Sequence, residues 1–226
     1  VSYPFIVSKL KNYCILCHNG LDRPIYEVSD NRFGITGKFI YKTCVVCKHI
    51  QLDPLIDEVN LLKYYEDHYN SVEKSTNNKY NNIRKFINSS FLGKLYNWLE
   101  GDISFSLIKG NGRLLEVGCN EGKNLQSYSN NGFEAFGLET NLLASKKAKK
   151  LGFKIFQDDI KNISNSEKFD VIVIPNVLEH VVKPIDFLNY IKKHLNKNGQ
   201  LWISLPNNTS FFRKIFSGNW INRHPP

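Results

Sequence analysis

The stretch Arg113–Gly122, RLLEVGCNEG, decides the fold of this chain. Its apolar residues predict a strand that breaks at Gly118 into a turn, and a helical pattern starts directly behind the turn. A strand, a glycine turn and a helix in this order present backbone N–H groups and a helix N-terminus to a small charged ligand. A carboxylate, Glu116, lies on the strand two residues before the glycine. The stretch therefore predicts a ligand site with an acidic component.

The glycine spacing separates two classes of nucleotide ligand. The dinucleotide fingerprint requires G-x-G-x-x-G, whereas positions 118, 120 and 123 of this chain are Gly, Asn and Lys. This spacing disfavours an NAD-dependent oxidoreductase. A carboxylate at position 116 can bind an ammonium group, which the methionine part of S-adenosylmethionine carries and a pyrophosphate lacks. The residues therefore favour S-adenosylmethionine as the ligand.

Strands and helices alternate through the rest of the chain. A polar helix after the glycine turn is followed by the strand FEAFGLE, which ends at Glu139. The strands FKIF and FDVIVIP come next, and the second of these starts at Phe169 and is continuously apolar, as burial on both faces requires. A fifth strand, QLWISLPN, follows a helix that begins at Pro184. This alternation predicts an α/β fold with a doubly wound, mostly parallel sheet, in which Glu139 is placed to bind ribose hydroxyls.

These motifs resemble those of the class I S-adenosylmethionine-dependent methyltransferases, a Rossmann-like family, over roughly residues 83–226. LLEVGCNEG is similar to the first motif of the family, GLETN to the acidic end of its second strand, QDDI to its adenine loop and FDVIVIPNVLEHV to its fourth-strand signature. One departure is Asn120, where most members carry glycine, but asparagine tolerates unusual backbone angles better than other non-glycine residues. By this resemblance the cofactor-binding residues are Glu116, Gly118, Cys119, Asn120, Gly122, Glu139, Thr140, Asp158, Asp159, Ile160 and Asn176.

The resemblance also implies a role for each of these groups. Glu116 would contact the methionine ammonium, the backbone of 118–122 would surround the methionine part, and Glu139 would bind the ribose diol. One of the two aspartates of QDDI, with Asp159 favoured, would meet the adenine amine, and Asn176 would lie below the sulfonium.

Each of these residues has a structural alternative. Glu116 can merely cap a turn, Glu139 can be a solvated strand end, and one aspartate of the pair 158–159 can be a helix N-cap. Cys119 is expected to be a small packed residue and not a nucleophile, because no histidine lies near it in the sequence.

The candidate catalytic base is His180, which follows the fourth strand at the edge where ligands bind and whose neutral form accepts a proton near pH 7. The alternative is that His180 only orients the loop. Glu179 can orient His180 or bind the acceptor. By resemblance, Asn207, Asn208 and Trp220, after the fifth strand, line the acceptor side.

Two C-x-x-C pairs lie near the N-terminus, Cys14 with Cys17 and Cys44 with Cys47, with 26 residues between them. Two such pairs provide a closed tetrahedral site of four thiolates, which predicts structural zinc in a zinc-ribbon-like module. The intervening residues can form a hairpin with KFIYKT as its returning strand. Disulfides are an alternative that is disfavoured because no signal peptide is visible, and a thioredoxin-type role is disfavoured because neither pair lies in a βαβ pattern.

The predicted organisation has three parts. They are a zinc-ribbon-like module over 1–52, a helical linker with N-terminal helices over 53–110, and a class I methyltransferase domain over 111–226. The chain ends at HPP, where the family continues into a C-terminal hairpin, and it contains no methionine. We therefore expect both ends to be truncated relative to the natural protein, with the last strands missing and an exposed sheet edge.

A net charge of +9 invites a nucleic-acid partner. The densest run of lysines, within 146–150, lies in the last turns of a predicted helix closed by Gly152, where cations complement the helix dipole and face water. Nucleic acid is therefore not expected as a partner. No apolar run approaches the roughly 18 residues that span a bilayer, the expected location is cytoplasmic, and the oligomeric state stays open.

The leading function is methyl transfer to a small molecule, with a sugar, a sugar nucleotide or a related hydroxylated metabolite as the acceptor. The end of the chain, from SLPNNTSFF onward, resembles a subgroup often tied to cell-surface sugar and lipid modification. That subgroup frequently carries a zinc-binding front piece followed by a stretch like 52–70 of this chain. The alternatives are a zinc-containing ribosomal-RNA methyltransferase and a catalytically inactive, methyltransferase-like binding module.

Overall fold

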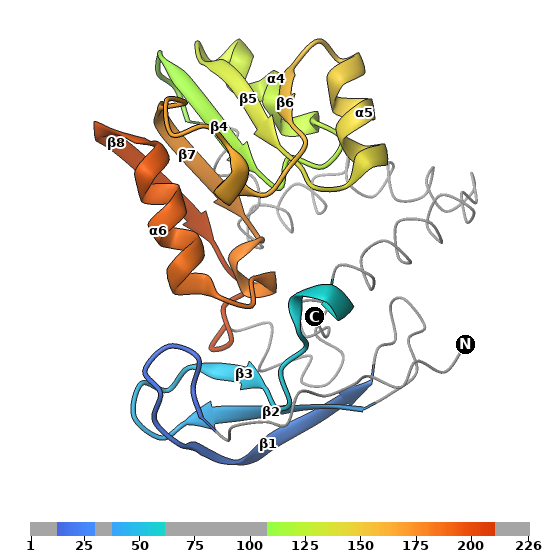
Figure 1. The fold of residues 1–226 in the computed structure, drawn as a ribbon, viewed down its shortest axis with the longest axis vertical. Coiled ribbons are helices and arrows are strands. Elements are labelled where there is room, and N and C mark those ends of the chain that lie inside the picture. Colours follow the sequence, from blue (N-terminus) through green and yellow to red (C-terminus); the bar gives the residue numbers. More distant parts are fainter. Residues whose placement is uncertain (1–12, 30–37, 62–107, 211–226) are drawn as a thin grey trace. The chain divides into compact units, whose positions relative to one another are not determined.

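The computed structural model describes residues 13–29, 38–61 and 108–210. These residues belong to two compact units (Figure 1). One unit contains the strands β1 to β3, and the other contains a five-stranded sheet with its helices. Most of the predicted region 53–110, and Trp220, lie outside the described residues.

The first unit is an antiparallel sheet with the strand order β1-β2-β3. Its strands are β1 (Leu21–Ser29), β2 (Lys38–Cys44) and β3 (Ile50–Leu52). β2 is the returning strand predicted from KFIYKT, and its last residue, Cys44, pairs with Leu21 at the start of β1. One C-x-x-C pair therefore lies just before β1 and the other begins at the last residue of β2, so the hairpin carries both pairs at the same end.

The second unit alternates strands and helices, as the sequence predicts. Its elements are β4 (Arg113–Val117), α4 (Lys123–Asn130), β5 (Glu134–Leu138), α5 (Leu142–Lys150), β6 (Lys154–Phe156), η2 (Ile160–Asn162), β7 (Phe169–Pro175), η3 (Leu178–His180), α6 (Pro184–His194) and β8 (Leu195–Ser204). The strand order is β6-β5-β4-β7-β8, and every neighbouring pair is parallel.

Two apolar clusters lie on opposite faces of this sheet because successive strand residues point to opposite sides. On one face, Leu114 packs with Leu125 of α4 and Ala148 of α5. On the other face, Leu115 packs in a cluster with Ile191 of α6. Helices thus cover both faces, which confirms the predicted doubly wound sheet, and each fully buried aliphatic side chain contributes about 1.5–3 kcal/mol of transfer free energy.

The last strand, β8, begins earlier than the pattern predicts. The sequence places its start at Gln200, whereas β8 starts at Leu195 directly after α6. Phe169 of β7 pairs with Leu195, and Val171 pairs with Gln200. The four polar or glycine residues 196–199 therefore lie in an irregular part of the strand where the register shifts. Regular pairing then runs through QLWIS, the part that the alternation of residues does predict.

The order of the strands also fixes where a ligand can bind. The chain leaves β4 toward β5 on one side of the sheet and later returns to β7 on the other side of β4. The carboxyl ends of β4 and β7 therefore border the point where the strand order reverses, which is the position of ligand crevices in open α/β sheets.

The lysine-rich helix α5 has the arrangement that its sequence predicts. Asn141 caps its first turn through bonds from the Leu143 and Ala144 amides, and three lysines lie in its last turn. Its buried face is made of Ala144, Ser145 and Ala148, so the lysines face water and complement the helix dipole. Within the described ranges, no helix combines the length and the apolar character needed to cross a bilayer.

Candidate functional site

A cavity of about 310 Å³ opens at the carboxyl ends of β4 and β7. Its lining residues are Glu116, Gly118, Cys119, Asn120, Glu121, Lys123, Asn124, Tyr128, Pro175 and Asn176. The cavity thus brings together five of the residues predicted to bind the cofactor, and it adds Asn124 and Tyr128, which were not predicted.

The backbone of the loop after β4 depends on two glycines. Gly118 has φ +73°, and a Cβ on it would lie 2.5 Å from Val177 Cγ2. Gly122 has φ +80°, and its Cβ would lie 2.9 Å from Ala148 Cβ. Asn120 between them has φ +49°, so asparagine occupies the left-handed conformation that its side chain tolerates better than most. The loop therefore closes against α5 and the chain after β7 in a way that larger residues at these glycines would prevent.

Glu116 is buried at the floor of the cavity, with 1% of its surface exposed. Asn124 Nδ2 donates a hydrogen bond to its Oε1 at 2.8 Å, so the contact comes from a side chain of α4 and not from a turn amide. Its Oε2 is buried, and no group of the described residues hydrogen-bonds to it. Burial raises the pKa of Glu116 to about 7. A buried carboxylate oxygen without a partner at a cavity wall is suited to bind a cation.

Glu139, at the end of β5, links two loops. Its Oε2 accepts a hydrogen bond from the Asn120 amide at 2.9 Å, and its Oε1 accepts one from the Asn141 amide at 2.7 Å. It is 7% exposed, so the interpretation as a solvated strand end is wrong. Burial raises the pKa of Glu139, against the effect of these hydrogen bonds. Thr140, the next residue, is exposed.

The aspartate pair after β6 forms the start of η2. Asp159 is the N-cap of this short helix and accepts a hydrogen bond from the Lys161 amide at 3.1 Å. Asp158 accepts bonds from the Asp159 amide and from Asn162 Nδ2, both at 2.7 Å. The N-cap alternative therefore applies to Asp159, while Ile160 is buried in the apolar cluster that also contains Leu115 and Ile191. An adenine contact by either aspartate stays a prediction.

The loop after β7 carries three further predicted residues, Asn176, Glu179 and His180. Asn176 lines the cavity with φ +50°, and its amide donates to the Ser204 carbonyl of β8 at 3.2 Å. Glu179 and His180 lie in η3, with 3.9 Å between Glu179 Oε1 and His180 Nε2. Neither is among the residues that line the cavity, so a catalytic role for them stays a prediction.

The polar pair after β8 forms a local turn. Asn207 Oδ1 accepts hydrogen bonds from the Thr209 amide at 2.9 Å and from Thr209 Oγ1 at 2.8 Å. Asn207 is exposed and Asn208 is half-buried. The predicted acceptor-side role of these two residues stays a prediction.

Cys119 is packed, as the sequence predicts. It is 4% exposed, and a Cβ on Gly137 of β5 would lie 2.4 Å from its Sγ. Burial raises the pKa of the Cys119 thiol to about 12, and the charges of Glu116 and Glu139 act in the same direction. A thiol with this pKa is not a nucleophile at neutral pH.

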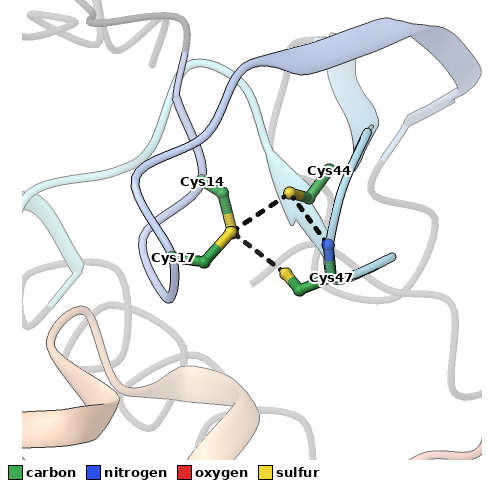
Figure 2. Close-up of side chains that lie close together, drawn as sticks. All are labelled: Cys14, Cys17, Cys44 and Cys47. Atoms are coloured by element: carbon green, nitrogen blue, oxygen red, sulfur yellow. Dashed lines mark hydrogen bonds between the residues drawn. The ribbon is translucent and has the colours of Figure 1, made fainter.

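The four N-terminal cysteines form a second site in the first unit (Figure 2). Their sulfurs all lie within 4.8 Å of one another, with 3.6 Å between Cys14 and Cys47 and 3.4 Å between Cys17 and Cys44. Zinc–sulfur bonds of 2.3 Å in tetrahedral geometry place sulfurs about 3.8 Å apart. The cluster therefore has the donor set and nearly the spacing of a four-cysteine zinc site.

The two C-x-x-C turns have the same construction. In each turn, the backbone amide of the first cysteine donates a hydrogen bond at 2.8 Å to the carbonyl of the residue five positions later. The sulfur of the same cysteine accepts a hydrogen bond at 3.4 Å from the backbone amide two positions later. The residue after the second cysteine, His18 or Lys48, has a positive φ of about 60°. Gln51 of β3, which the sequence did not single out, connects this strand to the first turn because its side chain accepts from the Ile15 amide and donates to the Tyr13 carbonyl.

Comparison with known proteins gives the following similarities. Residues 95–225 match the model of a family described as "Methyltransferase domain". The mitochondrial ubiquinone biosynthesis O-methyltransferase of Dictyostelium discoideum is 32% identical over 71 residues, which cover 30% of this chain and 22% of that protein. The ubiquinone biosynthesis O-methyltransferase of Rickettsia conorii is 31% identical over 102 residues, or 42% of this chain and 35% of that protein.

The solved structures that are similar include the plantazolicin methyltransferase BpumL in complex with SAH. The match has 22% sequence identity and a TM-score of 0.45, and it covers 64% of this chain and 59% of that one. This chain therefore spans between about a fifth and three fifths of the length of these proteins.

Proposed function

We propose, for a chain that belongs to the methyltransferase domain family, that it binds S-adenosylmethionine and transfers the methyl group to a small hydroxylated acceptor. The proposal combines the family with the chemistry of the cavity. The chain spans only part of the related proteins, so the acceptor and the activity of the whole protein are parts of the same proposal.

The observation that carries the proposal is the unpartnered Oε2 of Glu116 in the wall of the cavity. An ionised carboxylate in this position requires a cation, and the methionine part of S-adenosylmethionine has an ammonium group. The glycine loop over 118–122 supplies the small, left-handed backbone that lets a ligand approach the carboxyl end of β4. The residues present therefore fit the methionine part of this cofactor.

We assign the ribose and adenine parts of the cofactor to the residues that follow β5 and β6. Glu139 would bind the ribose hydroxyls, because each of its oxygens accepts one amide bond and has a further lone pair. Asp158 or Asp159, with Ile160 next in the sequence, would bind the adenine, and Thr140, next to Glu139, belongs to the same proposed cofactor site. Glu139 follows β5 and the aspartates follow β6, so the proposed sites follow the strand order from β4 outward.

The bound cofactor would supply a methyl group on a sulfonium, which is already a good leaving group. The protein then has to align the acceptor with the methyl carbon, a contribution that reaches ~7–11 kcal/mol in favourable systems. His180 would accept the proton of the acceptor hydroxyl, and Glu179, at 3.9 Å, would stabilise the imidazolium that forms.

A sugar or a sugar nucleotide is the proposed acceptor class, with Asn207, Asn208 and Trp220 on the acceptor side. Related proteins named as O-methyltransferases support transfer to oxygen. A ribosomal-RNA substrate is the less favoured alternative, because the lysines at the end of α5 complement the helix dipole and the related proteins are named for ubiquinone biosynthesis. RNA binding would weaken steeply with salt concentration, whereas binding of a neutral sugar would not.

The four-cysteine cluster is proposed to hold one structural zinc ion. Four thiolates complete a tetrahedral shell, so no open position remains for a substrate or a water molecule. Gln51 would hold the first turn in place, through its two hydrogen bonds to backbone groups of Tyr13 and Ile15.

The proposed function is tested by calorimetric titration of the chain with S-adenosylhomocysteine, repeated on Glu116→Gln. The matched control is Glu134→Gln, which removes a carboxylate from the amino end of β5, where the side chain is 68% exposed. We expect binding by the parent chain and the control, and a loss of about tenfold or more in Glu116→Gln, because charge-assisted hydrogen bonds contribute about 1.5–3 kcal/mol. Failure of the folded parent chain to bind would refute the proposal.

A further inference from the structure

Helix α4 places two polar side chains over the same part of β4. Asn124 and Tyr128 are four residues apart, so they lie one above the other on a single face of the helix. Both line the cavity, and Asn124 bonds to Glu116 on the strand beneath. Burial, and secondly the charge of Glu116, raises the pKa of the Tyr128 phenol.

The Tyr128 hydroxyl lies in an unusual environment. The side chain is fully buried, its ring packs in a cluster with Leu114 and Leu125, and the hydroxyl has no hydrogen-bond partner among the described residues. A buried polar group without a partner costs about 1–3 kcal/mol. Phenylalanine would fill the same space without this cost. A hydroxyl kept at a cavity wall under these conditions indicates a partner that enters with the ligand.

The chemistry of the cavity limits what this partner can be. Glu116 Oε2 only accepts hydrogen bonds when ionised, so it binds a cation, whereas a protonated phenol can donate. In an α-amino acid the ammonium and the carboxylate are attached to the same carbon atom. A ligand that places its ammonium on Glu116 therefore brings its carboxylate into the same cavity, where the Tyr128 hydroxyl is a buried donor without a partner among the described residues.

We propose that Tyr128 donates a hydrogen bond to the carboxylate of the cofactor's methionine part while Glu116 binds the ammonium, so that the cavity recognises both groups of the α-amino acid. The inference rests on the proposed function and assigns a binding role to a residue outside the glycine motif. Asn124 has a positioning role, since its amide holds Glu116 Oε1 while no group of the described residues hydrogen-bonds to Oε2.

Three related ligands test the assignment by calorimetry: S-adenosylhomocysteine, its decarboxylated form and its deaminated form. Tyr128→Phe should weaken binding of the two ligands that keep the carboxylate by about tenfold or more, and should leave the decarboxylated form unchanged. Glu116→Gln should instead weaken the two ligands that keep the amine. Tyr190→Phe, which removes a phenol from α6 outside the cavity, is the matched control and should change none of them.

Thermal unfolding of the free protein separates binding from folding. Because the hydroxyl has no partner among the residues that the structure describes, Tyr128→Phe should have a melting temperature equal to or above that of the parent chain. If Tyr128→Phe loses equal affinity for all three ligands, or for none, the carboxylate assignment is wrong while the proposed function stands. If the parent chain binds none of the three ligands, the proposed function itself fails.

Discussion

Replacing Glu116 by glutamine should stabilise the free protein in alkaline solution while it weakens binding. Burial raises the pKa of Glu116 from 4.5 to about 7, so the folded state disfavours the ionised carboxylate. Between these two values the unfolded chain has released the proton and the folded chain still holds it. The free energy of unfolding therefore falls as the pH rises from about 4.5 to about 7, and it stays low above that range.

The size of the effect follows from the same two values. At 1.36 kcal/mol for each unit of pKa, the difference between 4.5 and about 7 corresponds to about 3 kcal/mol at pH 8. At pH 5 the group is about three-quarters ionised in the unfolded chain and still protonated in the folded chain, and the same relation gives a difference of about 0.8 kcal/mol. Glutamine is neutral, has nearly the same size, and can still accept the Asn124 bond at 2.8 Å through its carbonyl oxygen.

Urea and thermal unfolding of both proteins, without ligand, at pH 8 and pH 5 measure this difference. At pH 8, Glu116→Gln should melt about 6–12 °C above the parent chain, since about 1 kcal/mol shifts a chain of this length by about 2–4 °C. The difference in melting temperature between the variant and the parent chain should decrease to a few degrees at pH 5. A variant that is no more stable than the parent chain at pH 8, or a gap that is equal at both pH values, would refute the electrostatic argument.

Three further predictions address the other features of the molecule. The affinity for S-adenosylhomocysteine should fall about tenfold for each pH unit below pH 7, because Glu116 must ionise to bind the ammonium, and titration in Glu116→Gln should show no such slope. Gly118→Ala should lower the melting temperature and abolish binding, because φ +73° and a Cβ 2.5 Å from Val177 Cγ2 both oppose the side chain, and normal binding would contradict this account of the loop. Cys44→Ser should lose the bound zinc, measured by metal analysis, while Cys119→Ala should keep it; zinc retained in Cys44→Ser would contradict the four-thiolate site.

The regular part of the fold is predictable because its signals are local. The apolar run that starts at Phe169 requires a strand covered on both faces, and the turn at Gly118 requires a residue without a Cβ. The clustering of the four cysteines into one site was predictable from their spacing alone, since each C-x-x-C pair can form its turn within a few residues. The strand, the glycine turn and the cysteine turns each depend on residues that are close in the sequence, and all three are present in the structure.

The rest depends on contacts between distant residues. No pattern within α4 shows that the Tyr128 hydroxyl is buried without a partner, because that requires the position of β4 below the helix. The start of β8 was misplaced because Leu195 pairs with Phe169 across an irregularity that no alternation of residues marks. Gln51 was missed because a lone glutamine in a short strand carries no signal before the two cysteine turns are seen together.

The link that Glu139 makes between two loops has a consequence for the entropy of binding. Its carboxylate already holds the loop after β4 and the start of α5, through the Asn120 and Asn141 amides. A ligand that adds to the free lone pairs of this carboxylate finds the loop preorganised, so little conformational freedom remains to be lost when it binds. One side chain would thus both order the loop before binding and recognise the ligand, and the two roles could be separated only by measuring loop mobility and affinity in the same variant.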